Sequence, residues 1–248
     1  MKPLVIGGRE LTTPCMVATA MAETADAMLQ QAARAVALGA DLVELRVDKL
    51  ADDADVAIIV QETDCPHIIA CRTPQFGGFF TGSEEARIAR LEGAARAGAT
   101  VVDIEYFTAP ELRARLIETA RACGMPVLIG YENMQETPDR QAMISGLHSV
   151  SELGPDLVKL AVRAHSYADL LTVLEVAHEA ASFLEAPFAV IALGAHGAPS
   201  RPLACVLGAS FTYCAMEQGA IPGQLTLQET REMVRLLEEQ RWSCSSKS

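Results

Sequence analysis

Residues 100–131 read TVVDIEYFTAPELRARLIETARACGMPVLIGY and contain one complete strand–helix–strand unit. The apolar run 100–105 predicts a buried strand, and 109–122 has the spacing of a helix with Pro110 in its first turn. Gly124 stands where that helix should end, and 126–131 predicts the next strand. Two strands joined by a helix of this length are typical of a parallel sheet.

The same unit recurs along the whole chain. Candidate strands lie near 14–19, 41–46, 67–72, 100–105, 126–131, 156–161, 187–192 and 208–214. Candidate helices lie near 23–39, 53–62, 83–97, 109–122, 137–152, 166–184, 199–207 and 226–240. Eight such units predict an α/β protein in which residues 1–248 form a single (β/α)8 TIM barrel, with a tail that frays from about 243. A doubly wound open sheet is the alternative.

The charge balance limits the partners that this protein can have. The formal net charge is −12, which disfavours nucleic acid and anionic membrane surfaces. An anionic substrate therefore needs a local group of arginines or lysines. We expect a small-molecule carboxylate as the partner, with no nucleic acid and no membrane.

The cysteines and the apolar runs indicate the compartment. The seven cysteines are scattered without a C-x-x-C pair, which suits buried thiols in a reducing cytoplasm and predicts neither a disulfide framework nor a metal site. The first residues show no apolar core of a signal peptide, and no apolar run is long enough to span a bilayer. We therefore expect a cytoplasmic protein.

Polar residues at the carboxyl ends of the strands are the candidates for chemistry, because active sites of such barrels lie there. Alternation places Glu44 and Arg46 on one face of strand 41–46, and Arg72 ends the next strand. Asp103 and Glu105 alternate on strand 100–105. Later in the chain come Glu132 after the fifth strand, Lys159 within the sixth, and Arg201 and Gln224 in the last two loops.

Lys159 is the most informative of these residues, since it interrupts the apolar run 157–161. Lysine is rarely buried without a partner or a function. Desolvation and nearby arginines would lower its pKa, and a neutral amine can attack a ketone to form a Schiff base. The alternative is a structural ion pair of Lys159 with Asp103 or Glu105.

Together these motifs resemble type I 3-dehydroquinate dehydratases. The resemblance extends from about Cys15 to Leu237 and is carried, in the family's order, by DLVELRVD at 41–48, ACRT at 70–73 with GG at 77–78, VVDIE at 101–105, TP at 137–138, DLVKLAV at 156–162, SR at 200–201 and PGQL at 222–225. The resemblance implies a (β/α)8 barrel, usually dimeric, that needs neither a metal nor an organic cofactor.

The resemblance also implies roles for individual residues. The amine of Lys159 would form an imine with the C3 ketone of 3-dehydroquinate and serve as the electron sink for β-elimination of water. Arg201 and Gln224 would hold the substrate carboxylate, while Glu44, Arg46 and Arg72 would hold hydroxyls and shape the site. The product, 3-dehydroshikimate, belongs to the shikimate pathway of aromatic amino acid biosynthesis, and quinate catabolism is the other setting for this reaction.

Three positions depart from the family pattern. The family's acid/base histidine lies in a motif like S-Y-H-x-F-x-x-T-P, whereas residues 130–138 here read GYENMQETP and place Glu132 at the histidine position. Phe76 stands where the family has a glutamate before Gly-Gly, and Ala220 stands at a common serine position. Because an apolar neighbour such as Phe76 favours the protonated form of a buried carboxyl, our hypothesis is that Glu132 replaces the histidine as acid/base.

Other interpretations remain open from the sequence. Glu132 could instead form an ion pair with Lys159 or Arg72 in an inactive site, and His165 or His196 could reach the barrel mouth. The chain could act on a relative of 3-dehydroquinate, or be a class I aldolase for a sugar phosphate. It could also be a non-catalytic protein that traps a keto acid on Lys159.

Overall fold

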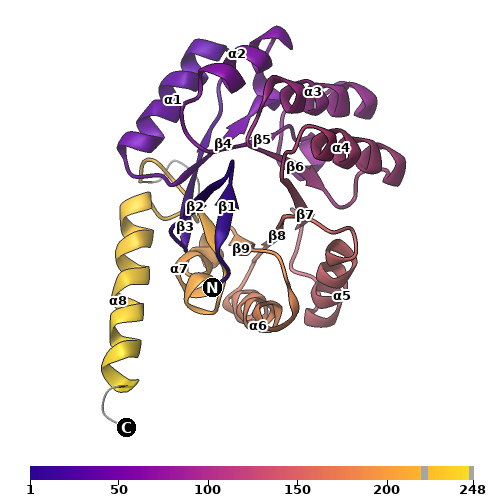
Figure 1. Ribbon diagram of the computed structural model, residues 1–248. Coiled ribbons are helices and arrows are strands. Elements are labelled where there is room, and N and C mark those ends of the chain that lie inside the picture. The colour runs from indigo at the N-terminus through magenta and orange to yellow at the C-terminus, as the bar shows by residue number, and fades with distance from the viewer. Residues whose placement is uncertain (219–222, 246–248) are drawn as a thin grey trace.

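Eight parallel strands form a barrel in the computed structural model, which describes residues 1–218 and 223–245, with side chains as far as residue 239. Their order in the sheet is β10-β3-β4-β5-β6-β7-β8-β9. The strands are β3 (Cys15–Ala20), β4 (Leu42–Arg46), β5 (His67–Ala70), β6 (Val101–Glu105), β7 (Val127–Asn133), β8 (Leu157–Arg163), β9 (Phe188–Leu193) and β10 (Phe211–Cys214). Each predicted strand overlaps one of these, and the TIM barrel is confirmed over the open sheet (Figure 1).

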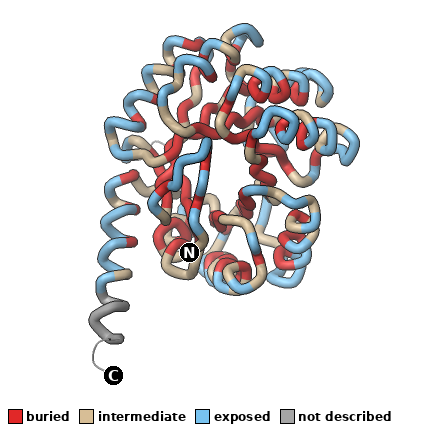
Figure 2. The backbone as a smooth tube through the Cα atoms, viewed as in Figure 1, coloured by how far each residue is buried: buried red, intermediate tan, exposed pale blue. Residues whose placement is uncertain are grey.

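Helices surround the barrel and bury their inner faces against it, so that the strands form the buried centre (Figure 2). In the described residues they are α1 (Ala25–Ala37), α2 (Ala54–Glu62), α3 (Glu84–Ala97), α4 (Pro110–Ala122), α5 (Arg140–Ser151), α6 (Tyr167–Phe183), α7 (Ser200–Val206) and α8 (Leu227–Ser245). Local capping residues begin and end them, as in α3, where Ser83 caps the first turn by accepting from the Ala86 amide and Gly98 ends the helix in the left-handed conformation.

The last part of the chain contains helix α8 and two short segments that lie outside the described residues. Fraying is predicted from about 243, and helix α8 runs to Ser245, while 246–248 lie outside the described residues. Ala220 and Pro222 also lie outside them. Of the helices that the structure describes, none has the length and apolar character needed to cross a bilayer.

A hairpin that the sequence analysis did not predict covers the amino-terminal end of the barrel. It consists of β1 (Leu4–Ile6) and β2 (Arg9–Leu11), which pair antiparallel and lie across the barrel opening in Figure 1. Leu4, Ile6 and Leu11 are buried, and they pack in one cluster with the first inward-facing residues of the strands, Val17, Leu42, Ile68, Val101, Leu128 and Leu157. The interior is therefore filled at this end, and the cavity that the described residues line lies at the other.

The barrel closes between β9 and β10 without a regular ladder. The backbone amide of Ser210 donates to Phe188 O at 2.8 Å, and the amide of Cys15 donates to Ser210 O at 2.9 Å. Helix α7 packs against both strands and covers this seam from outside. The seam carries some of the site residues, because α7 begins with Ser200 and Arg201.

Candidate active site

Alternation along the strands directs a set of polar side chains into a cavity at the carboxyl-terminal end of the barrel. The cavity has a volume of about 380 Å³. Seven of the nine candidate residues from the sequence line it, namely Glu44, Arg46, Arg72, Glu132, Lys159, Arg201 and Gln224, and the other two, Asp103 and Glu105, lie buried behind Arg72. Phe76, at the family's loop glutamate position, lines it as well.

The guanidinium of Arg72 stands at the centre of four buried carboxylates. It pairs with Asp103 and with Glu132, and its Nη1 lies 3.3 Å from Glu105 Oε1. Its Nη2 lies 3.9 Å from Glu44 Oε1. Although burial lowers the pKa of Arg72, these four carboxylates outweigh it and raise that pKa well above its usual range. Arg72 is thus a permanent cation around which the acids are arranged.

Lys159 lies beside this cluster and contacts two of its carboxylates. Its Nζ is 2.6 Å from Asp103 Oδ2 and 3.0 Å from Glu132 Oε1, and the residue is only 3% exposed. Burial and Arg72 lower the pKa of Lys159, but Asp103, Glu132 and Glu44 outweigh them, so that the pKa is raised. The expectation of a lowered pKa was therefore wrong for the resting enzyme, because carboxylates from neighbouring strands reach the amine.

Glu132 has a cation on each oxygen. Oε2 accepts from Arg72, and Oε1 faces Lys159. The environment of this carboxyl is ionic, in contrast to the apolar one that Phe76 alone led us to expect. A side chain at Gly130 would push this carboxyl aside, since a Cβ built there would lie 2.9 Å from Glu132 Oε1 and 3.2 Å from Lys159 Cε. Gly130 thus leaves the space that the carboxyl occupies.

Arg87 supports the cluster from behind and was not among the predicted residues. It comes from α3, and its Nη1 donates to Glu105 Oε2 at 2.8 Å and to the carbonyl of Cys71 at 2.8 Å. Burial, with Glu132 and Asp103 adding to it, raises the pKa of Glu105 against the opposing effect of Arg72 and Arg87. Within the described residues, no group of three or more histidine, cysteine, aspartate or glutamate side chains has an arrangement that could hold a metal ion.

Arg46 fixes the loop that follows β5. Its guanidinium makes a two-point contact with Asp48 at 2.7 and 2.9 Å and donates to Gly77 O at 3.1 Å. Asp48 in turn accepts from the amide of Phe79 at 3.0 Å. Arg46 therefore holds the loop with Phe76 at the edge of the cavity.

Three residues that line the cavity have buried polar side-chain atoms without a hydrogen-bond partner among the described residues. They are Arg201 with Nε and Nη1, Tyr213 with its hydroxyl, and Gln224 with Oε1. Arg201 is 1% exposed, and burial lowers its pKa to about 10. A buried polar atom left unpaired costs about 1–3 kcal/mol, so this wall of the cavity is built to receive a polar ligand.

Arg163 is a further cavity residue that the sequence analysis missed. Its Nε donates to Met134 O at 2.6 Å, and no carboxylate in the described part of the chain lies within salt-bridge distance of it. The signal was present, because Lys159, Ala161 and Arg163 alternate on β8 and therefore face the same side. Tyr213 could have been found in the same way on β10.

The histidines lie away from the chemistry. All five are in the described part of the chain, and none lines the cavity. His165 is exposed and its Nε2 lies 2.7 Å from Gln135 O, and His196 packs edge-on against Tyr167. The expectation that either could serve this site finds no support in the geometry.

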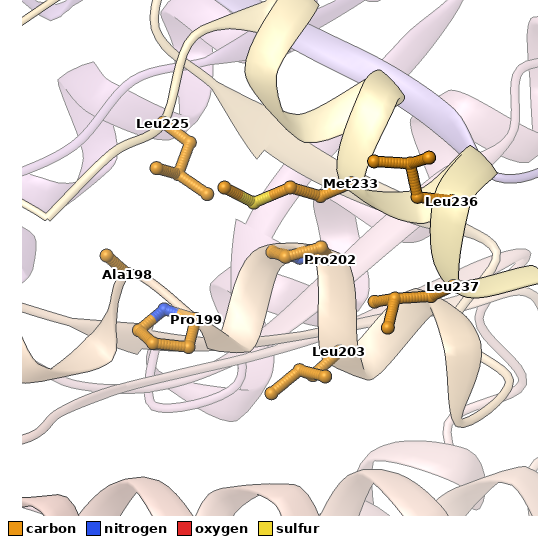
Figure 3. A pocket seen from close by; sticks show the side chains of 8 residues that line it. All are labelled: Ala198, Pro199, Pro202, Leu203, Leu225, Met233, Leu236 and Leu237. Carbon is orange, nitrogen blue, oxygen red and sulfur yellow. The ribbon is translucent and has the colours of Figure 1, made fainter.

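A second hollow lies outside the barrel between α7 and α8 and has a volume of about 440 Å³ (Figure 3). Its lining is apolar throughout: Ala198, Pro199, Pro202, Leu203, Leu225, Met233, Leu236 and Leu237. Chain neighbours face opposite ways here, since Arg201 and Gln224 point into the cavity while Pro202 and Leu225 line the groove. With no titratable group in its lining, this groove is not a site of acid–base chemistry.

Comparisons with known proteins point in one direction. A family model described as Type I 3-dehydroquinase matches residues 16–241. A 3-dehydroquinate dehydratase of Methanothermobacter thermautotrophicus is 34% identical over 214 residues, covering 86% of this chain and 92% of that protein. The enzyme of Methanosarcina barkeri is 35% identical over 222 residues, covering 85% and 90%.

Solved structures agree with these sequence matches. The type I 3-dehydroquinate dehydratase of Clostridium difficile, solved with covalently modified comenic acid, superposes with a TM-score of 0.90 at 21% identity, covering 96% of this chain and 99% of that one. The 3-dehydroquinate dehydratase of Enterococcus faecalis gives a TM-score of 0.85 at 25% identity, covering 94% and 99%.

Proposed function

This chain belongs to the type I 3-dehydroquinate dehydratase family, a family of hydro-lyases of the shikimate pathway, and we propose that it converts 3-dehydroquinate to 3-dehydroshikimate with Lys159 as the imine-forming amine and Glu132 as the acid/base. The observation that carries the proposal is the contact of Lys159 Nζ with Glu132 Oε1 at 3.0 Å, on the floor of a cavity that also holds the unpartnered Arg201. The reaction needs neither a metal nor an organic cofactor, because the imine itself is the electron sink.

Substrate binding begins at the wall of the cavity where Arg201, Tyr213 and Gln224 present polar atoms that have no hydrogen-bond partner among the described residues. Arg201 and Gln224 hold the carboxylate and thereby offset the repulsion expected from a protein of net charge −12. Glu44 and Arg72 hold the ring hydroxyls from the opposite side, and Arg46 keeps the loop in place. The ketone is thereby positioned over Lys159, and correct positioning of this kind is worth several powers of ten in rate.

Glu132 moves protons in two successive cycles. In the first it carries two protons, one after the other, from the nitrogen of Lys159 to the ketone oxygen. Loss of the first proton frees the amine to attack the C3 ketone, the second is removed before the carbon–nitrogen double bond forms, and the oxygen, now protonated twice, leaves as water. In the second cycle it removes the proton from the carbon beside the iminium. The enamine then breaks the bond to the β-hydroxyl, and Glu132 protonates the departing oxygen. Hydrolysis of the product imine restores Lys159.

The test uses the purified protein with 3-dehydroquinate. Product is followed at the ultraviolet absorbance of the conjugated enone, and borohydride trapping with mass spectrometry identifies the modified lysine. Product together with an adduct on Lys159 supports the proposal, and Lys49 provides a control residue that should stay unmodified. An adduct without product would indicate a protein that traps a keto acid without dehydrating it. The absence of both product and adduct would refute the proposed substrate.

A dehydratase for a related keto acid is the second candidate, and Arg163 is the observation that favours it. A guanidinium without a carboxylate partner in the described residues, in the same cavity as Arg201, suits a substrate with a second anionic group. Comparison of kcat/KM for 3-dehydroquinate and for analogues with a second carboxylate or a phosphate decides between the two candidates.

The assembly proposed for the chain rests on its membership of the family. We propose a homodimer, which light scattering coupled to size-exclusion chromatography would show as twice the mass of the chain, 26.5 kDa. A monomer at micromolar concentration would refute it. The cytoplasmic location stays a prediction from composition.

A further inference from the structure

Tyr213 lies at the end of β10 with its ring beside the reactive amine. Lys159 Nζ is 5.4 Å from the centre of the ring. The carboxyl end of the same strand is tied to the loop that carries Gln224, because the amide of Ala215 donates to Leu225 O at 2.8 Å. Tyr213 thus lies beside the imine-forming lysine and lines the same cavity as Arg201 and Gln224.

The hydroxyl of Tyr213 is buried without a partner. The residue is 6% exposed, it lines the cavity, and its oxygen makes no hydrogen bond to any described residue. Burial raises the pKa of Tyr213 well above its usual range, and the nearby carboxylates Glu44 and Asp103 add to this effect. The phenol therefore keeps its proton, and it can only be satisfied as a donor or acceptor by something that enters the cavity.

The chemistry of the proposed substrate identifies what would enter. In 3-dehydroquinate the hydroxyl that leaves and the carboxylate are bonded to the same ring carbon, next but one to the ketone carbon. A substrate with its carboxylate on Arg201 and its ketone on Lys159 must therefore hold the departing hydroxyl between these two groups. Tyr213 is a neutral donor whose ring lies beside Lys159 and which lines the same cavity as Arg201.

We propose that Tyr213 is a further catalytic residue, whose O–H donates a hydrogen bond to the hydroxyl that leaves the substrate. The carbon–oxygen bond breaks, its electron pair goes to the oxygen, and Glu132 supplies the proton that makes water. Tyr213 keeps its own proton and stabilises the negative charge that develops on the oxygen as the bond breaks. This inference rests on the proposed function and assigns it one more group.

Tyr213→Phe in the full-length chain tests the role, since it removes one oxygen and leaves the ring. We expect kcat to fall about 10²- to 10³-fold, as when one donor to a developing oxyanion is lost, with KM changed less than about twofold. Borohydride should still trap Lys159. The trapped adduct should shift from the product form to the substrate form, which is heavier by one water, because elimination is slowed after the imine has formed.

Thermal unfolding distinguishes this role from a structural one. Because the hydroxyl makes no hydrogen bond to any residue that the structure describes, its removal should leave the melting temperature unchanged or raise it. Tyr106→Phe is the matched control, because Tyr106 is half-buried, packs against Phe107 and Tyr131, and lies outside the cavity. It should keep the wild-type kcat and adduct ratio.

Three results would overturn the inference: an unchanged kcat, an effect confined to KM, or a loss of kcat in proportion to a lower melting temperature without the shift in adduct mass. The wild-type assay separates these from failure of the proposed function. If the wild-type protein does not dehydrate 3-dehydroquinate, the function fails. If it does and Tyr213→Phe equals it, only the role of Tyr213 fails.

Discussion

Nζ of Lys159 lies 3.0 Å from Oε1 of Glu132, so the amine that must lose a proton already touches the carboxylate that would take it. The same contact is expected if the two groups form only a structural ion pair. Turnover is therefore the property that separates the two interpretations, because only a catalytic role of Glu132 predicts that loss of its carboxyl slows the reaction.

Glu132→Gln should lower kcat by about 10²- to 10⁴-fold, because an amide cannot accept and return a proton. The adduct on Lys159 should still form, since Asp103 remains 2.6 Å from the amine. Steady-state rates and borohydride trapping measure both quantities. Glu111→Gln, on the exposed first turn of α4, is the control. Near-normal turnover of Glu132→Gln would remove Glu132 from the mechanism.

Gly130→Ser should lower kcat by about ten- to a hundredfold, because its side chain would displace the Glu132 carboxyl from Lys159. In a Glu132→His background the same change should cost little, since serine and histidine occupy these positions together in the family motif that residues 130–138 resemble. A double-mutant cycle on kcat measures this coupling. Gly93→Ser, where a side chain meets open space, is the control. Additive effects would contradict the explanation.

Asp103→Asn should move the pH dependence of imine formation to lower pH. Burial and Arg72 lower the pKa of Lys159, whereas Asp103 is the largest of the contributions that raise it. The amine attacks only when neutral, so loss of that carboxylate frees it at a lower pH. The rate of borohydride-dependent inactivation against pH measures the midpoint. Asp26→Asn, on an exposed turn of α1, should leave the midpoint in place. A midpoint that moves to higher pH would contradict the assignment.

Arg163→Gln should raise KM for 3-dehydroquinate about tenfold and change kcat much less, since a charge-assisted hydrogen bond is worth about 1.5–3 kcal/mol. The guanidinium is held by Met134 O and faces the cavity without a carboxylate partner in the described residues. Initial rates over a range of substrate concentrations separate the two constants. Arg140→Gln removes an exposed guanidinium that pairs with Glu179 and provides the control. Equal KM values in Arg163→Gln and wild type would exclude Arg163 from substrate binding.

The alternation of residues along the strands and the order of the strands were enough to predict the barrel and much of the candidate site. They sufficed to bring Glu44, Arg72, Glu132 and Lys159 to one cavity, because residues two apart on a strand face the same side and the strand ends of a barrel converge. The hairpin of β1 and β2 was missed because strands of three residues are too short to show a period.

The state of Lys159 could not be predicted in the same way. Its pKa depends on distances to Asp103 and Glu132, which lie on β6 and β7. Strand tilt and register set these distances, and neither is visible in a single strand. Burial alone predicted the opposite sign of the shift, since the desolvation penalty is apparent from an apolar run while the partners are not.

The hairpin at the amino-terminal end has a consequence for the traffic of molecules through the barrel. Leu4, Ile6 and Leu11 seal that end, so the substrate, the product and every water molecule share one opening. In the proposed mechanism, the water released when the imine forms must pass the bound ligand to escape, and the water that later hydrolyses the imine must enter by the same route. A ligand that fills the opening would thus keep the water released on imine formation next to the imine carbon, where the final hydrolysis needs a water molecule.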